Sequence, residues 1–367
     1  MNKWFATAFN TSILEKQRLA WVDYLRGIAI LLVVYRHVLL GLENSHLTIP
    51  RPLVDANMIF FSFRMPLFFI LSGIFINGSI ARRPLKNLVF TKFENLLYPY
   101  LVWSFIQVTL QILLSRYSNT DRTIRDYSFI LYQPRALDQF WYLPALFNTT
   151  IVYLLVKVKA RAPAWSQLVI GLALYTVYFR FPFVQKISML SDWMEFYIFF
   201  ALGDVISDLF FRERSQQFLK NPLTLLLVIP IFTATQIYYL RHYPVGAVEF
   251  LAIALIGCFS MFVLSFRLQT WNILRFLRVL GFHSLFIYVM HVLVAAFVRA
   301  ILMRFFGIRS PEILLFSGIL AGVVIPVMFY NLWIKDNILW FLFYLKKPGK
   351  RKKDSASPSS PGPLSAG

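Results

Sequence analysis

The residues best suited to chemistry lie in one apolar stretch near the start of the chain. Residues 21–41 read WVDYLRGIAILLVVYRHVLLG and are apolar enough to cross a membrane, yet they carry Asp23, Arg26, Arg36 and His37. Each ionisable group inside a bilayer costs roughly 2.5–3.5 kcal/mol on insertion scales, so such groups usually mark a site or a pairing partner. We therefore expect the functional site to be built around this stretch.

On a helix, three of these side chains share one face. Successive residues turn by about 100°, so Asp23 lies on the face of Arg26, and His37 is turned only about 20° from it. The rise of about 1.5 Å per residue places Arg26 and His37 roughly 16 Å apart along the axis. A site at one membrane surface would thus connect to an imidazole deeper in. The alternative is an interfacial pair of Asp23 and Arg26, with His37 near the other end of the helix.

The composition places the rest of the chain in a membrane as well. Of the 367 residues, 58% are hydrophobic and 18% aromatic, and the mean hydropathy is +0.61. Apolar runs recur along the whole chain, which predicts an all-α polytopic membrane protein and not a soluble domain with an anchor. We expect about ten transmembrane helices, over residues 22–40, 57–79, 95–114, 140–156, 166–180, 192–210, 222–240, 247–265, 280–303 and 313–334.

The distribution of basic residues predicts the topology. They gather in alternate loops, so both termini are expected in the cytoplasm. The net charge of +20 is explained in this way, and no nucleic-acid partner is expected. The predicted organisation is a cytoplasmic segment over 1–21, one membrane domain over 22–345, and a disordered basic tail over 346–367 that touches anionic lipid. The first residues lack the features of a signal peptide.

A second buried cation, Arg64, lies in the second predicted helix. In the predicted topology it is about two turns from the outer surface, near the level of His37. There it could stabilise an oxyanion or hold a carboxylate or phosphate. The alternative is a structural pair with a carboxylate of a neighbouring helix. The candidates lie on the sixth predicted helix and are Asp192, Glu195, Asp204 and Asp208. Pro66, two residues further on, is expected to kink the helix.

A basic cluster before the third predicted helix is the candidate cofactor site. Cations at a membrane surface can hold the phosphates of a nucleotide-like cofactor, whereas retention of the loop in the cytoplasm is the alternative explanation. No glycine-rich phosphate loop accompanies the cluster. Its members are Arg82, Arg83, Lys86 and Lys92.

Two further groups are candidates for substrate contact. Trp141 and Tyr142, at the outer start of the fourth predicted helix, could stack on a sugar ring or anchor the helix at the interface. Ser284, Tyr288 and His291 share one face of the ninth predicted helix. The role of His291 has two alternatives at this point: it relays protons, or it is a hydrogen-bonded histidine of the protein core.

The remaining polar residues bear on metal binding, disulfide formation and substrate contact. The histidines and carboxylates lack the spacing of metal ligands, so no metal is expected. Cys258 is the single cysteine, so no disulfide can form within the chain. The long outward loop over 115–139 could cap a site or contact a substrate.

Five stretches resemble the acyltransferase family 3 membrane enzymes. The likeness is closest to the fucose 4-O-acetylase-like branch and to exopolysaccharide acetylases of the xanthan type. It implies transfer of an acyl group, usually acetyl from cytoplasmic acetyl-CoA, to a hydroxyl of a surface carbohydrate. In chain order the stretches are DYLRGIA with His37, PLFFILSGIFI, LLYPYLVWS, FWYLPALF and HSLFIYVMH.

The resemblance also implies roles for individual residues. The family's paired arginine and histidine fall on Arg26 and His37, which makes His37 the general base for the acceptor hydroxyl. The family's R-x-x-R motif before the third helix aligns with Lys92 and Asn95. This departure keeps one cation and loses the other, and the remaining cations of the basic cluster would compensate. The extracellular hydrolase-like domain of many relatives is missing from this sequence.

Together these observations predict a mechanism. CoA phosphates would bind Arg26 and the basic cluster, and the pantetheine arm would carry the thioester toward His37, a distance of the same order as its extended length. The imidazole would deprotonate the sugar hydroxyl. Arg64 would polarise the thioester carbonyl, and Asp23 is a further catalytic candidate.

Two alternatives remain at this point, an O-succinyltransferase of the same fold and an exporter of lipid-linked saccharides. The expected partners are a carbohydrate acceptor, either a surface polysaccharide or a lipid-linked oligosaccharide, together with membrane lipids and polysaccharide assembly proteins. The expected location is the bacterial inner membrane, which the chain would cross several times.

Overall fold

The computed structural model describes residues 7–15, 19–115, 122–335 and 337–347. Beyond residue 347 the predicted basic tail lies outside the described residues. The described chain is helical without strands, which confirms the all-α membrane fold. Within it, seven helices are long and apolar enough to cross a membrane. They span Ala20–Glu43, Arg51–Arg82, Leu85–Leu113, Pro222–His242, Ala247–Trp271, Ser284–Arg304 and Pro311–Ile334.

The predicted spans that are not among these seven coincide with shorter or more charged helices, labelled α9, α10 and α11. Their crossing of the membrane, and the side on which the termini lie, stay predictions. The α-helices are α2 Ala20–Glu43, α3 Arg51–Ile59, α4 Phe61–Ile74, α5 Ile76–Arg82, α6 Leu85–Lys92, α7 Tyr98–Leu113, α8 Phe129–Tyr132, α9 Tyr142–Leu154, α10 Ala164–Arg180, α11 Ser188–Val205, α12 Ser207–Phe211, α13 Glu213–Lys220, α14 Pro222–His242, α15 Ala247–Trp271, α16 Phe276–Phe282, α17 Ser284–Arg304 and α18 Pro311–Phe329.

Short turns of other helix types join or extend these elements. Three π-helical turns continue an α-helix: η2 Phe93–Leu97, η6 Leu155–Lys159 and η8 Tyr330–Ile334. The 3₁₀ turns are η1 Thr11–Leu14, η4 Ile124–Ser128, η5 Pro134–Leu137, η7 Pro182–Lys186 and η9 Ile338–Leu342.

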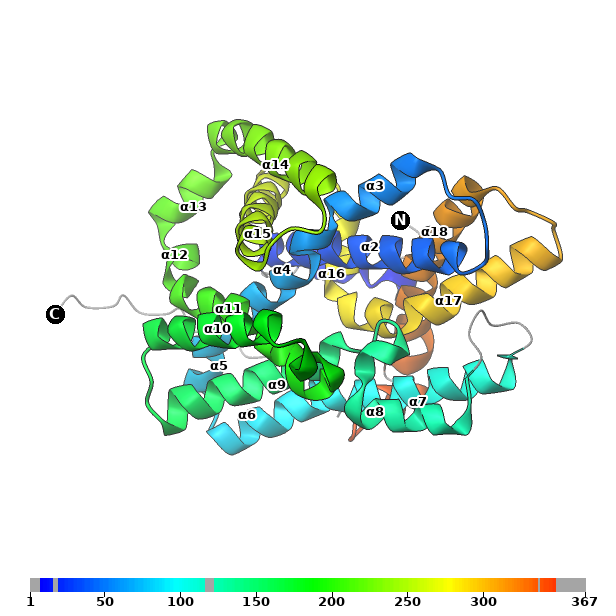
Figure 1. Cartoon of the computed structure of the whole chain (residues 1–367), viewed down its shortest axis with the longest axis horizontal. Helices are drawn as coiled ribbons and strands as arrows, with labels where there is room; N and C mark the ends of the chain where they lie inside the picture. Colours follow the sequence, from blue (N-terminus) through cyan, green and yellow to red (C-terminus); the bar gives the residue numbers. More distant parts are fainter. Residues whose placement is uncertain (1–6, 16–18, 116–121, 336, 348–367) are drawn as a thin grey trace.

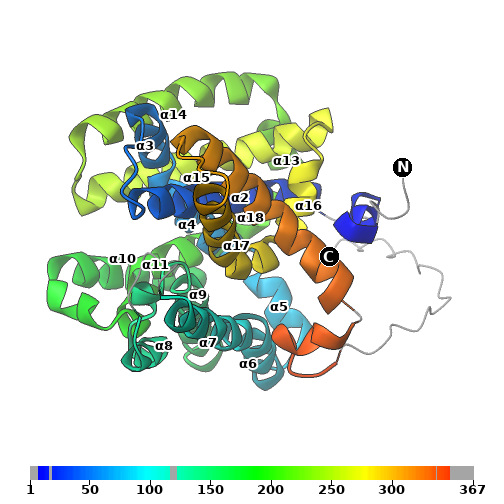
Figure 2. The ribbon, with the colours of Figure 1, turned by 90° about the vertical axis from the view of Figure 1, so that its right-hand side faces the viewer.

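Helix α2 lies at the centre of the fold. It packs against α4, α15, α16, α17 and α18, because apolar residues surround it on nearly every side and only a narrow polar stripe interrupts them. These helices form one layer, and α6 to α10 form a second layer beside it (Figures 1 and 2). Helix α11 packs against α4 of the first layer and against α9 and α10 of the second. It therefore joins the two layers.

Glycine pairs allow the closest helix contacts. A Cβ atom on Gly73 of α4 would meet the backbone of α11, and one on Gly203 of α11 would meet the backbone of α4. Where α2 crosses α16, a Cβ atom on Gly27 would likewise meet the backbone of α16, and one on Gly281 would meet the backbone of α2. Small residues let membrane helices approach closely enough to pack backbone on backbone. These crossings set the rotation of α2 and α4, and hence the direction of their polar side chains.

The second predicted helix is divided into three, though not at the expected place. Breaks occur at Phe60, with ψ 4°, and at Phe75, also with ψ 4°, whereas Pro66 lies inside α4. The expected kink at the proline is thus replaced by two breaks that flank α4. The first break brings Asn57 of α3 next to Arg64, whose Nη1 donates to the Asn57 side-chain oxygen at 3.2 Å.

Candidate functional site

Three cavities follow α2 from one end to the other, and we name them inner, central and outer after the predicted topology. Their volumes are about 500, 120 and 400 Å³. Tyr288 lines both the inner and the central cavity, and His37 lines both the central and the outer cavity. The cavities therefore adjoin one another at these two side chains.

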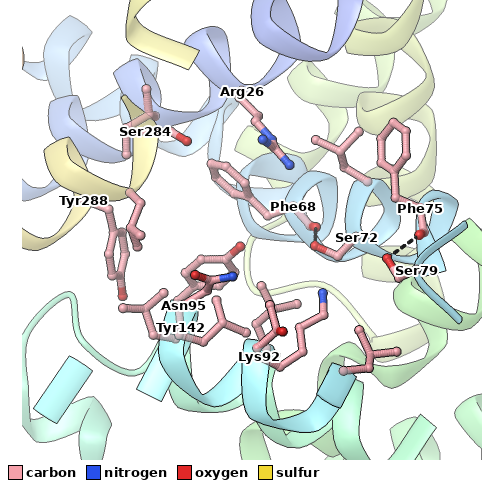
Figure 3. Close-up of a pocket in the computed structure, with 18 of the residues that line it drawn as sticks. Arg26, Phe68, Ser72, Phe75, Ser79, Lys92, Asn95, Tyr142, Ser284 and Tyr288 are labelled. Atoms are coloured by element: carbon pink, nitrogen blue, oxygen red, sulfur yellow. Dashed lines mark hydrogen bonds between the residues drawn. The ribbon is translucent and has the colours of Figure 1, made fainter. Parts of the chain in front are cut away.

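The inner cavity lies between the two helix layers and is basic. Figure 3 shows Arg26 of α2 and Lys92 of α6 pointing into it from opposite walls. Arg82 and Arg83 add two further cations, and no acidic residue of the described chain lines this cavity. Arg83 donates to the Thr91 hydroxyl at 3.0 Å. Such a cavity favours an anionic ligand.

The two positions of the altered family motif both face the inner cavity. Lys92 ends α6 and Asn95 lies in the π turn η2, three residues on, so both side chains fall on the same side of the helix. Lys86 does not line any of the three cavities, because it lies on the exposed side of α6. Of the predicted cofactor residues, the structure thus brings together all but Lys86.

The central cavity brings His37 and Arg64 together, as the sequence predicts. Arg64 is 2% exposed, and its Nη1 also donates to the Leu32 carbonyl oxygen at 2.8 Å. Its Nη2 has no hydrogen-bond partner among the described residues. The guanidinium is therefore held by an amide and a carbonyl, and the alternative of a carboxylate partner on a neighbouring helix is wrong.

His291 lies behind His37 and lines none of the three cavities. It is fully buried, and its Nδ1 lies 2.8 Å from the Tyr288 carbonyl oxygen and 3.0 Å from that of Ile287. Both partners are acceptors, so Nδ1 carries the proton. The prediction that His291 contacts the substrate is corrected here, because the ring is enclosed; a hydrogen-bonded core histidine is what the structure shows.

The aromatic candidates divide between the cavities. Trp141 lines the central and outer cavities, whereas the adjacent Tyr142 lines the inner one. Tyr142 packs edge to face on Tyr288, with ring centroids 5.4 Å apart, and the Tyr288 hydroxyl donates to the Gln139 carbonyl. Ser284 lines the inner cavity, one turn before Tyr288. These tyrosines form the wall between the inner cavity and the part of the site that contains His37.

Asp23 is the predicted catalytic residue that the structure keeps away from the cavities. It is 1% exposed and lies one turn before Arg26, on the part of α2 that crosses α16 at Gly281. It is not among the residues that line the three cavities. Its place in the fold fits a structural role in that crossing better than contact with a substrate.

Arg135 is a site residue that the sequence did not single out. Its Nε donates to Asp192 at 2.7 Å and its Nη2 to Glu195 at 2.8 Å, and its guanidinium lies 4.4 Å from the Trp141 ring centroid. Burial lowers the pKa of Arg135, but the charges of Glu195 and Asp192 outweigh this and raise the pKa above its usual value. The expectation that these carboxylates pair with membrane arginines is corrected, since their partner comes from a loop.

The sequence feature that could have indicated Arg135 is the loop before α9, because its length and its predicted outward position suggest that it covers a site. Its residues Arg135, Asp138 and Gln139 line the central or outer cavity.

The described residues contain no group of three or more His, Cys, Asp or Glu that could hold a metal ion. The Cys258 side chain is buried, with its sulfur 3.7 Å from the Phe63 carbonyl oxygen.

The fold and the cavities define a multi-pass membrane protein with a basic site at one end and a histidine site beyond it. The model of the acyltransferase family 3 domain, described as an acyltransferase domain, matches residues 19–332. The chain therefore belongs to acyltransferase family 3 and is a membrane acyltransferase for groups other than aminoacyl groups. No curated protein and no solved structure matches it. The resemblance at family level is confirmed, and this membership favours an enzyme over an exporter.

Proposed function

We propose that this acyltransferase moves an acetyl group from cytoplasmic acetyl-CoA to a sugar hydroxyl of a bacterial surface polysaccharide or its lipid-linked precursor. The proposal places the protein in the inner membrane. The observation that supports it most is the order of the cavities along α2. A basic cavity, which no acidic side chain of the described residues lines, adjoins at Tyr288 a cavity that contains His37.

The inner cavity has properties suited to the donor. Its volume of about 500 Å³ is within the range of about 300–1,000 Å³ that is typical of small-molecule sites. Arg26, Arg82, Arg83 and Lys92 would bind the CoA phosphates through charge-assisted hydrogen bonds. Helix α2 is unbroken from Ala20 to Glu43, so Arg26 and His37 keep a separation of about 16 Å along its axis. The pantetheine arm would cross this separation past Tyr288.

The transfer itself would occur at His37. Its imidazole takes the proton of the acceptor hydroxyl while that oxygen attacks the thioester carbonyl carbon. The carbon–sulfur bond then breaks, and the CoA thiolate leaves and receives the proton from the imidazolium. Arg64, held beside this point by Leu32 and Asn57, would stabilise the negative charge on the thioester oxygen. Trp141 would stack on the acceptor sugar.

The test is the acyl content of the host's purified surface polysaccharide, measured by proton NMR. A deletion strain is complemented with wild type, with His37→Ala, or with His242→Ala as a control at an exposed histidine. We expect acetyl signals to be lost in the deletion and to return with wild type and the control. Because a general base contributes about 10²–10⁴-fold to the rate, His37→Ala should not restore them.

Each other result has a distinct meaning. Succinyl signals in place of acetyl signals would make succinyl-CoA the donor of the same reaction. If the acyl content per sugar stays constant in the deletion while the polymer yield collapses, the proposed transfer is wrong. Full restoration by His37→Ala would remove His37 from the mechanism.

A further inference from the structure

The outer cavity has a composition that the transfer chemistry does not explain. Residues from the last turns of α2, the middle of α17, the end of α7 and the loop before α9 line its volume of about 400 Å³. Three arginines are among them, Arg36, Arg135 and Arg299, and Asp138 is the one acidic residue of the described chain that lines it. Arginine is costly at membrane depth and is seldom placed there without a function.

Two acidic residues that line the outer cavity or the adjoining central cavity already have cationic partners. Asp138 lies 4.0 Å from Arg122 and accepts hydrogen bonds from two glutamine amides. Glu195, which lines the adjoining central cavity, pairs with Arg135 at 2.8 Å. These carboxylates are therefore not available to neutralise Arg36 or Arg299.

Arg36 and Arg299 make no ion pair with a carboxylate of the described residues. The nearest influence is the charge of Glu43, at the end of α2, which acts on Arg36 from beyond ion-pair distance. The guanidinium of Arg36 lies over the Phe61 ring, 5.1 Å from its centroid. That of Arg299 lies against Gly41, where a Cβ atom would collide with its Nη1. Both side chains line the cavity. The contacts that hold the two guanidiniums are thus an aromatic ring and a glycine, with no carboxylate of the described residues at ion-pair distance, and a cavity lined in this way is suited to an anion.

We propose that the outer cavity binds an anionic group of the acceptor between Arg36 and Arg299. The group is a carboxylate or a phosphate, since both oxyanions fit the fork of a guanidinium. A carboxylate would belong to an acidic sugar, and a phosphate to the carrier of a lipid-linked saccharide. The inference rests on the proposed function, because it specifies the acceptor of that transfer. The anion would hold the acceptor while its hydroxyl reaches His37, which lines the same cavity.

The test measures binding without transfer. Full-length protein in lipid nanodiscs is saturated with CoA, and ligand-observed NMR then compares glucuronate, inorganic pyrophosphate and neutral glucose. The variants are Arg299→Gln, Arg299→Lys and the control Arg304→Gln, which changes an exposed arginine of the same helix outside the cavity. Thermal unfolding verifies that each variant is folded.

We expect an anion to bind more tightly than glucose. Loss of a charge-assisted hydrogen bond at Arg299→Gln should weaken it about tenfold, whereas Arg299→Lys should keep part of the affinity and Arg304→Gln all of it. Binding of glucuronate alone identifies an acidic sugar, and binding of pyrophosphate alone identifies a carrier phosphate. If neither anion binds better than glucose, or if folded Arg299→Gln binds as wild type does, the proposal is overturned. Because no acyl transfer is measured, failure here leaves the proposed acetylation standing, and loss of the acetylation result leaves the anion site standing.

Discussion

His37 and His291 meet edge to face, with ring centroids 5.2 Å apart and ring planes at 62°. Because the Nδ1 proton of His291 is directed at backbone carbonyls, its Nε2 is left as an acceptor. This nitrogen has no hydrogen-bond partner among the described residues. An acceptor nitrogen thus lies in the ring that packs against the proposed general base. We expect His291 to act as a positioning residue for His37.

The first prediction concerns this histidine pair. His291→Phe keeps a ring of similar shape and removes the acceptor nitrogen, so the orientation of His37 should be less well defined. We expect kcat for acetyl transfer to fall by about tenfold or more, less than the loss at His37 itself, while KM for acetyl-CoA stays unchanged because the donor binds elsewhere. Steady-state kinetics in membrane vesicles measures both values. A rise in KM with constant kcat would contradict a positioning role.

The second prediction concerns donor binding in the inner cavity. Lys92→Gln removes one charged contact and should raise KM for acetyl-CoA about tenfold. The double change of Lys92→Arg with Asn95→Arg restores the family motif at two positions that line the cavity, so it should lower KM. The matched control is Lys86→Gln, a cation of the same helix that faces away from the cavity. An equal rise in KM for the control would mean that overall charge, and not this cavity, governs donor binding.

The third prediction tests the crossing of α4 and α11. Gly73→Ala adds a Cβ atom where the backbone of α11 already lies, and overpacking of this kind costs about 1–3 kcal/mol. We expect a lower thermal unfolding midpoint in detergent and a lower yield. Gly246→Ala is the control, because the nearest atom to its added Cβ is 3.6 Å away. Equal midpoints for the two variants would show that the helices separate easily.

The fourth prediction concerns the ion pairs of Arg135. Arg135→Gln leaves Asp192, whose side chain is 2% exposed, without its cation. Because Arg135 is itself partly exposed, we expect a loss of about 1–3 kcal/mol, between the values for surface and buried pairs. Adding Asp192→Asn should recover part of the loss, as a double-mutant cycle would measure. Additive effects of the two changes would contradict the pairing.

The stabilisation by Arg135 should also persist as the pH rises through the physiological range. Burial lowers the pKa of Arg135, but Glu195 and Asp192 raise it further, so its folded value lies above the unfolded one. A cationic group whose pKa is higher in the folded than in the unfolded state contributes its full stabilisation at any pH below the unfolded pKa. It loses this stabilisation only as the pH rises from the unfolded pKa through the folded pKa. The unfolding difference between wild type and Arg135→Gln should therefore not shrink as the pH rises from 6 to 9 through deprotonation of Arg135, which circular dichroism can follow.

The class of the protein and the axis of its site follow from the amino-acid sequence alone. A segment inside a bilayer must satisfy its backbone internally, so recurring apolar runs can only be helices, and the family motifs follow from short local stretches. The spacing of Arg26 and His37 likewise depends only on helix geometry. Arg64 could be placed near His37 because the predicted topology gives the directions in which both helices cross the membrane.

Which side chains share a cavity depends on how the helices pack, and this could not be predicted from local sequence. The rotation of each helix depends on distant contacts such as that between Gly73 and Gly203. A rotation of about a third of a turn would exchange Lys86 with Lys92 at the cavity wall. The positions of loop residues depend even more on such contacts. Arg135 lies beside its carboxylate partners and lines the outer cavity because of tertiary packing, which no local sequence pattern predicts. His291 was placed behind His37 for the same reason, since two helices far apart in the sequence must first pack before their side chains can meet.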